Sequence, residues 1–476
     1  MTPAPHATLK RFSTGLLLFW IVTAFAISGF IKIAAPEEYR ETVLDHTAQL
    51  LEGEGSDDSW GAMKDALTHF YTKPGVPVYS EVFFKNGSRF QYPPSSLFAL
   101  MALELAGEDN VRTKEDMPDS PYPFVNDVIG WLFILMSFAS AAALLEIGLA
   151  ARFGDEARSY RALRVVTVAC LTLTFYPVVK AYTLGQIQVW INGFLALALL
   201  LWALGRKAGS GALIGAVCLL KPHYGLFVVW AALRGEWRLL FGCLIVASAG
   251  LAAAAAVFGV ANHLDYLRVL SFLSERGEVY YPNHSINGLL NRLMALKAPQ
   301  DFVILEFDAG KFAPYTPLVY WGTVVSSALI LGAALLHRRK NYGSDSLLDF
   351  ATMALSLTMA SPIAWEHHYG ILLPIFALLA ARIARPASLA WLAFAYALAA
   401  TYIQAAQLLA RTPFNPLQSY LLFAGLAVLI ALHVSKAEAR RRIGDAPPSG
   451  PDYRPEAAPE NYTAPQDTPV LVRQSG

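Results

Sequence analysis

Long blocks of apolar residues, separated by short polar stretches, dominate the chain. The first block, residues 12–31, has no charged residue and is long enough to cross about 30 Å of hydrocarbon as a helix. Nine later blocks have the same character, so the pattern predicts an all-α polytopic membrane protein with ten crossings. The later blocks are residues 128–151, 165–179, 187–204, 239–260, 318–336, 350–364, 369–381, 389–406 and 417–434.

Two weaker apolar segments do not fit this pattern. One covers residues 94–106, and the other consists of residues 212–220 and 224–233, interrupted by Lys221-Pro222. Each piece is too short to span a bilayer alone. We therefore expect re-entrant or half-depth helices, which membranes tolerate where the helices line a protein cavity.

Arginine and lysine residues predict the orientation, because short cytoplasmic loops carry an excess of them. With ten crossings, all the basic clusters and both termini lie in the cytoplasm. The membrane is expected to be the plasma (inner) membrane. Residues 36–122, with a first outer loop at 36–92, and residues 261–315 then lie outside. If both weak segments crossed, residues 152–164 would move outside, which their arginines disfavour.

Composition agrees with a membrane location. Of the 476 residues 55% are hydrophobic and 15% charged, whereas soluble domains carry about 25% charged residues. The net charge of +1 gives no reason to expect nucleic acid as a partner. The three cysteines lie in apolar runs without metal-ligand spacing, so they predict packing and no metal site. Residues 1–442 are interpreted as one transmembrane domain, and residues 443–476 as a disordered cytoplasmic tail rich in Pro, Ala and Glu.

Polar residues gather at the predicted outer ends of the helices, where ionisable groups are costly unless they face a cavity or a partner. We expect them to converge on one pocket. The candidates are Asp57 and Asp58 after the first crossing; Gln91 and Tyr92; Lys180 and Gln186; Lys221 and His223; His284, Asn287 and Arg292; and Trp365, Glu366, His367 and His368.

This set of residues suits a substrate that combines a phosphate with a sugar. Cations hold a phosphate, and aromatic faces stack on a sugar ring. A carboxylate can take the proton of an attacking hydroxyl, and a phosphate leaving group needs only cations to stabilise its charge. One acid and a basic cluster are therefore sufficient for transfer of the sugar.

Each candidate also has a structural interpretation. Asp57 and Asp58 also fit as solvated loop acids or helix N-caps, and Tyr92-Pro93-Pro94 as a helix start. Lys180 and Arg292 fit as partners of lipid phosphates at the interface. Adjacent histidines on one helix point in different directions, so the His367-His368 pair favours hydrogen bonding or phosphate binding over a metal.

The order of these motifs resembles a known family. An early Asp in the first outer loop is followed by Tyr92-Pro93-Pro94, Gly185-Gln186, Lys221-Pro222, an Asn-His-Ser-x-Asn motif with a following Arg, and Ser-Pro-x-x-Trp-x-His-His. This order is similar to that of the polyprenyl-phosphate-mannose-dependent mannosyltransferases of glycosyltransferase family 87, within the C-type membrane glycosyltransferase superfamily. The resemblance covers roughly residues 12–381, and it implies a bundle like those of the C-type enzymes.

The resemblance implies inverting transfer of a sugar, with mannose expected, from a polyprenyl-phosphate donor to a glycolipid or glycan acceptor at the outer face. The base would be Asp58 or its neighbour Asp57. His367 or His368, together with Lys221 and Arg292, would face the donor phosphate. No cofactor is implied, although the residues leave a divalent cation open. Membrane lipid is the remaining partner, and acceptor specificity does not carry over, because residues 44–55 and 85–87 depart from the family pattern.

Two other functions remain open from the sequence. A secondary transporter also has broken helices and buried charges, but we find no internal repeat of the kind many transporters carry. A non-enzymatic envelope protein would not need the early Asp.

Overall fold

The computed structural model describes residues 5–105, 122–279, 281–295, 312–336, 344–383 and 385–444. Within these ranges the regular structure is helical, apart from an isolated bridge between Asn283 and Trp365. The chain divides into residues 1–436 and residues 437–476. Of the second unit, only the end of the last helix, to Gly444, is described. All that follows concerns the first unit.

Within the described ranges, five helical segments are long and apolar enough to cross a membrane. The first comprises α1 and α2, which continue one another through a π turn at Val22–Ala26. Two pairs of helices are bent at a short break and add up to two further spans, if each pair crosses the membrane as one span. They are α7 with α8, and α18 with residues 404–410. The protein is thus an all-α polytopic membrane protein. The bounds are α1 Pro5–Ile21, α2 Ile27–Ala34, α6 Tyr122–Phe153, α7 Arg161–Leu173, α8 Tyr176–Thr183, α12 Trp237–Phe258, α15 Pro317–Leu336, α18 Pro386–Ala400 and α19 Tyr420–Gly444.

Shorter helices account for the remaining apolar blocks. They are α5 Leu97–Leu105, α9 Gln188–Ala203, α10 Lys207–Cys218, α11 Leu226–Arg234, α16 Ser344–Met359 and α17 Leu372–Arg382. At 1.5 Å per residue, the 12 residues of α10 reach only about 18 Å. This length fits the expected half-depth pair around Lys221-Pro222, while the total of ten crossings stays a prediction.

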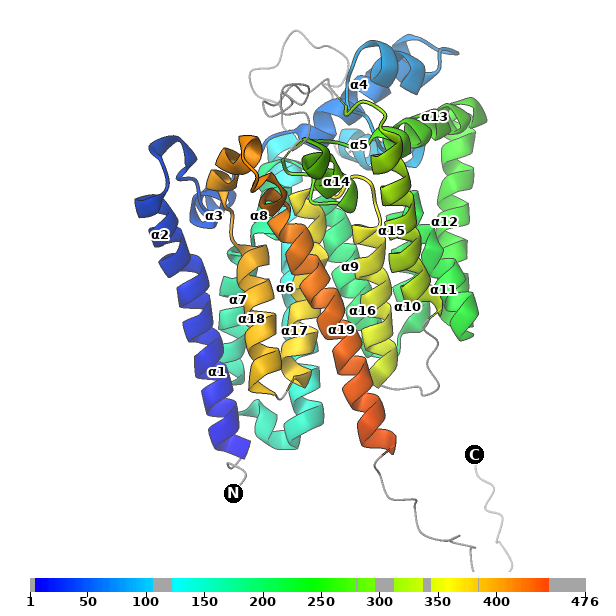
Figure 1. Ribbon diagram of the computed structural model, residues 1–476. Coiled ribbons are helices and arrows are strands. Elements are labelled where there is room, and N and C mark those ends of the chain that lie inside the picture. The colour runs from blue at the N-terminus through cyan, green and yellow to red at the C-terminus, as the bar shows by residue number, and fades with distance from the viewer. Residues whose placement is uncertain are drawn as a thin grey trace, which may run out of the picture. The chain divides into compact units, whose positions relative to one another are not determined.

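The segments expected outside the membrane are not simple loops. Residues 36–92 contain α3 Val43–Glu52 and α4 Asp58–Thr72, and residues 260–295 contain α13 Val260–Arg276 and α14 Ile286–Ala295. A capping box starts α3, because Thr42 and Asp45 satisfy each other's free backbone groups. In Figure 1, α4 and α13 lie at one end of the bundle, and the N-terminal end of α1 lies at the other.

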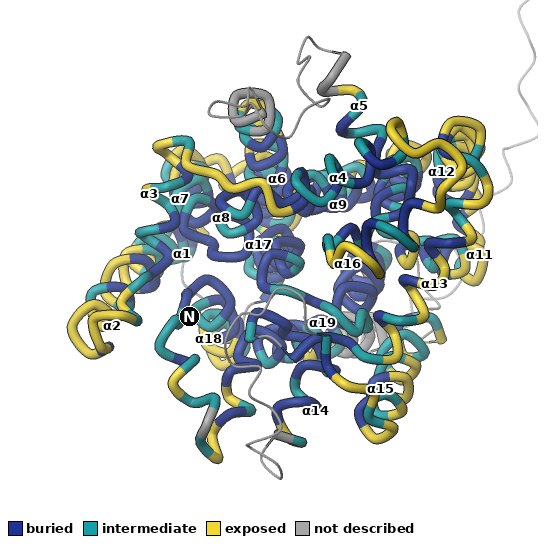
Figure 2. The backbone as a smooth tube through the Cα atoms, turned by 90° about the horizontal axis from the view of Figure 1, so that it is seen from above, coloured by how far each residue is buried: buried dark blue, intermediate teal, exposed yellow. Residues whose placement is uncertain are grey.

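The helix bundle has a buried interior and an apolar outer surface. Viewed from above, α17 runs buried through the interior, whereas α2, α12 and α15 expose their outward faces (Figure 2). The exposed side chains on these outer helices are large and apolar, for example Ile33, Ile245 and Leu329. Contiguous apolar surface of this kind is expected where a protein meets lipid.

Glycines bring α10 and α12 into close backbone contact. A Cβ added at Gly211 would lie 2.1 Å from the Leu239 carbonyl oxygen, and one at Gly242 would lie 2.3 Å from that of Ala208. Neither position has room for a larger residue. Small residues that let backbones approach are a common way to join helices within membranes.

Candidate active site

A cavity of about 560 Å³ opens among α4, α13, the Lys221-Pro222 break and the segment before α17. We call it the polar cavity. Most of the candidate residues named from the sequence line its wall. They are Asp58, Gln91, Tyr92, Gln186, Lys221, His223, Trp365, His367 and His368.

Backbone hydrogen bonds fix the start of α4 against the segment before α9. The amide of Asp58 donates to the Leu184 carbonyl at 3.1 Å, and that of Ser59 donates to the Gly185 carbonyl at 3.2 Å. Gly185 has φ +62°, and a Cβ there would lie 1.7 Å from the Ser56 carbonyl oxygen. Glycine is thus required at this position both by the backbone conformation and by the close approach of the two segments.

The Asp58 side chain accepts a hydrogen bond from the Gln186 amide nitrogen. The amide oxygen of Gln186 accepts from the Ser59 hydroxyl at 2.7 Å and from the Tyr92 hydroxyl at 2.9 Å. Since these hydroxyls occupy the oxygen, the nitrogen of the same amide is directed at Asp58. Burial among protein atoms raises the pKa of Asp58, whereas Gln186 and the charge of Arg89 lower it. The net shift is upward, which makes the carboxylate a stronger proton acceptor.

Asp57 has a different environment. It precedes α4 and does not line the polar cavity. Its carbonyl accepts from the Gly61 amide at 2.6 Å, which belongs to the first turn of α4. Of the two aspartates that the sequence left as alternatives, the structure places only Asp58 in the cavity wall.

Arg89 and Glu278 were not among the sequence candidates, yet they belong to this site. Arg89 lines the cavity, and its Nη1 lies 3.2 Å from a carboxylate oxygen of the buried Glu278. The Trp365 indole N–H donates to the other oxygen of Glu278. Burial raises the pKa of Glu278, and the Arg89 charge opposes that rise. The only hint in the sequence was the position of Arg89, two residues before Gln91.

Lys221 occupies the break between α10 and α11. Its amide donates to the Val217 carbonyl at 2.8 Å, and Pro222 then prevents the helix from continuing. The ammonium donates to the Gln188 side-chain oxygen at 2.7 Å and lies 2.8 Å from His368 Nε2. The Lys221 side-chain nitrogen and the His368 imidazole are thereby held together at the cavity wall.

The side chains of the adjacent residues His367 and His368 face in different directions. Their rings meet at 89° with centroids 4.7 Å apart. Across the described residues, no group of three or more His, Cys, Asp or Glu side chains is placed to hold a metal ion.

Arg292 lies outside the wall of the polar cavity. Its buried guanidinium donates to the carbonyls of Asn283 at 3.0 Å and Tyr281 at 2.6 Å, and to the Ser419 hydroxyl at 2.7 Å. Asn287 also lies outside; it accepts from the Asn291 side chain at 2.9 Å. The Arg292 bonds tie α14 to the segments around Tyr281 and Ser419, whereas the bond between Asn287 and Asn291 lies within α14.

Glu366, His284 and Lys180 form a second group of candidates outside the cavity wall. Glu366 accepts from the Tyr176 hydroxyl at 2.8 Å, and its other oxygen lies 3.7 Å from His284 Nε2. The Lys180 ammonium lies 5.9 Å from the centre of the Tyr402 ring, within the range of a cation–π contact. The expected single pocket therefore corresponds to the polar cavity and a buried polar group beside it, joined through the adjacent residues Glu366 and His367.

The model of glycosyltransferase family 87 matches residues 90–362, which is more than half of the chain. The chain belongs to glycosyltransferase family 87. Comparisons with curated proteins and with solved structures found no match. The protein is therefore a membrane glycosyltransferase, and such an enzyme requires a sugar donor and an acceptor.

The family 87 match covers only part of the polar cavity. Tyr92, Gln186 and Lys221 lie within residues 90–362, whereas Asp58 lies before them and His367 and His368 lie after them. The fold brings all six to one cavity wall. For this glycosyltransferase the polar cavity is accordingly the candidate active site.

Proposed function

We propose that the protein transfers a sugar, with mannose expected, from a polyprenyl-phosphate donor to a glycolipid or glycan acceptor, with inversion at the anomeric carbon. The observation that carries this proposal is the presence of Asp58 and Lys221 on the wall of one cavity. A carboxylate and a cation in one site are what a single displacement with a phosphate leaving group needs.

Asp58 is the general base in this proposal. It takes the proton of the acceptor hydroxyl while the oxygen bonds to the anomeric carbon, and the bond between that carbon and the phosphate oxygen breaks. The Gln186 amide supports this role because it orients the carboxylate from one side. Asp57 lies outside the cavity wall, which favours Asp58 over its neighbour.

The donor phosphate is assigned to the basic wall of the cavity. Lys221, His223, His368 and Arg89 supply hydrogen-bond donors there, and cations are the groups that stabilise the charge of a departing phosphate. Their presence makes a general acid unnecessary.

Arg292, which the family resemblance places at the donor phosphate, and Lys180, a further candidate phosphate ligand, receive a positioning role in this proposal. The bonds of Arg292 to Asn283 hold the segment that pairs with Trp365 in the isolated bridge. Glu366 and His284, which lie 3.7 Å apart, are part of the same paired segments on the side away from the cavity. Through Trp365 and His367 this group shapes the cavity wall without contacting the donor.

The remaining wall of the cavity suits the other parts of the substrates. Leu220, Leu226, Leu270 and Leu331 give an apolar side that fits an isoprenoid chain. Tyr92, Tyr266 and Trp365 add aromatic faces for a sugar ring.

We place transfer at the outer face of the plasma membrane, with both termini in the cytoplasm. This orientation rests on Arg152, Arg158, Arg161 and Arg164, which lie in or beside the turn between α6 and α7. That turn lies at the same end of the bundle as the start of α1 and opposite α4 (Figure 1).

The test is transfer by purified protein from labelled polyprenyl-phosphate sugars. Asp58→Asn keeps the shape of the side chain but cannot accept a proton, so it should abolish transfer while binding of a non-hydrolysable donor analogue survives. Asp57→Asn is the matched control and should lose much less. If Asp57 is the sensitive position, the base has been misassigned by one residue. If neither change matters, the base mechanism fails, and uptake of the sugar lipid by proteoliposomes would then favour a transporter.

A further inference from the structure

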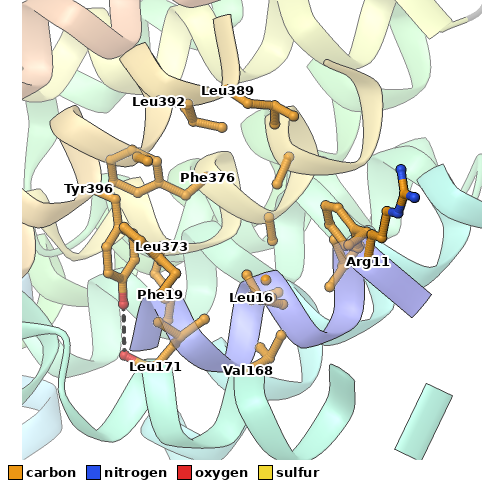
Figure 3. Close-up of a pocket in the computed structure, with 17 residues that line it drawn as sticks. Arg11, Leu16, Phe19, Val168, Leu171, Leu373, Phe376, Leu389, Leu392 and Tyr396 are labelled. Atoms are coloured by element: carbon orange, nitrogen blue, oxygen red, sulfur yellow. Dashed lines mark hydrogen bonds between the residues drawn. The ribbon is translucent and has the colours of Figure 1, made fainter. Parts of the chain in front are cut away.

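A second pocket, separate from the polar cavity, lies among α1, α6, α7, α17 and α18. Its volume is about 330 Å³, and we call it the apolar pocket. Figure 3 shows Phe19, Phe376 and Tyr396 gathered on one side and Arg11 at the opposite edge. Arg11 is the charged residue among the side chains that line it.

Water does not fit this pocket. A buried water needs two to four polar partners. The Tyr396 hydroxyl already donates to the Leu171 carbonyl at 3.1 Å, and the other lining side chains apart from Arg11 carry no polar atoms. An apolar space of this size within the spanning helices suits hydrocarbon and excludes water.

Arg11 indicates which charge the polar end of a bound molecule should carry. Its side chain is exposed, and the described part of the chain provides no hydrogen-bond or ion-pair partner for it. In Figure 3 its guanidinium points away from the apolar lining. The end of α17 at Arg382 and the residue before α18, Arg385, add positive charge near Ala380 and Leu389 of the same pocket. An anion outside the mouth of the pocket is the complementary group.

We propose that the apolar pocket binds one acyl chain of an anionic glycerophospholipid, whose phosphate pairs with Arg11. The start of α1 lies at the end of the bundle opposite α4 and α13, which border the polar cavity (Figure 1). The bound lipid is thus distinct from the sugar donor and belongs to the other leaflet. This site does not depend on the proposed function.

The experiment is a native mass spectrometry titration of the purified, delipidated full chain. Phosphatidylglycerol and phosphatidylcholine with identical acyl chains are compared. Wild type should retain one phosphatidylglycerol and bind phosphatidylcholine more weakly. Arg11→Gln should weaken phosphatidylglycerol binding about fivefold, the effect of one interfacial cation, while Lys10→Gln, an exposed neighbour outside the lining, should not.

A filling variant tests the pocket itself. Gly15 lines it, and a Cβ built there meets no described atom within 4 Å, so Gly15→Trp can occupy the space without disturbing the helix. Gly29 is equally unobstructed but does not line the pocket, which makes Gly29→Trp the matched control. Gly15→Trp should abolish retention of the lipid and Gly29→Trp should preserve it. Equal retention by both variants, or equal affinity of wild type for the two headgroups, would mean non-specific annular lipid and overturn the proposal.

Discussion

Replacing Gly185 with alanine tests whether the backbone contact before α9 positions the base. The new methyl group would lie 1.7 Å from the Ser56 carbonyl oxygen, so the two segments must separate by roughly 1–2 Å to restore an ordinary contact. Alanine at φ +62° adds about 1 kcal/mol of strain. The amides of Asp58 and Ser59, which donate across this contact, would lose their partners.

The expected consequence is kinetic. A displacement of about 1 Å in a positioning element can cost roughly 100-fold in rate. We expect Gly185→Ala to lower kcat by about that factor while affinity for a non-hydrolysable donor analogue changes little, since Lys221 lies on a different element. Initial rates with labelled donor, measured beside donor-analogue binding, separate the two effects.

Gly205→Ala is the control for backbone strain alone. Gly205 has φ +74°, but a Cβ there meets no described atom within 4 Å. It should carry the strain without displacing Asp58, so its kcat should stay near wild type. If Gly185→Ala keeps full activity, or if Gly205→Ala loses as much, the contact at Ser56 does not position the base.

Three further outcomes follow from the structure. Because the carboxylate form of Asp58 takes the proton, kcat/KM should fall as the pH drops through the raised pKa of Asp58. Arg89→Gln removes a charge that lowers this pKa, so it should move the acid limb of the pH profile to higher pH. An unchanged acid limb would mean that Arg89 does not influence the pKa of the base. Lys221→Ala should weaken binding of a lipid-phosphate analogue at fixed ionic strength by tenfold or more, and equal affinity would assign Lys221 to bulk lipid. A cysteine at Ser159 should resist an impermeant thiol reagent in intact cells while one at Ser88 reacts, and equal labelling of the two would overturn the proposed topology.

The apolar blocks predicted the helices well because their length is set by the membrane. Residues 12–31, 128–151 and 239–260 fall within α1–α2, α6 and α12 or within two residues of their ends. The break at Lys221-Pro222 was also predicted, since proline after a lysine cannot continue an apolar helix. The family assigned from the motif order was confirmed by the match to residues 90–362.

The direction of individual side chains could not be predicted from the same pattern. Position at the outer end of a helix indicates depth in the membrane, but not which neighbour a side chain faces. Arg292 has the depth of a phosphate ligand, yet carbonyls and a hydroxyl surround its guanidinium. Arg89 and Glu278 were not predicted as site residues, because they belong to segments far apart in the sequence that pair only in the fold. The helices α4 and α13 were missed because their polar faces resemble loops in composition.

The glycine contacts between α10 and α12 have a consequence for how the enzyme responds to its bilayer. At about 18 Å, α10 is too short to be held by both interfaces, whereas the 22 residues of α12 extend about 33 Å. The depth of α10, and of Lys221 beyond its end, is therefore set by the hydrophobic match of α12. A bilayer whose thickness differs from α12 would tilt that helix and carry the Lys221 ammonium with it. We expect turnover to depend on the acyl-chain length of the host membrane.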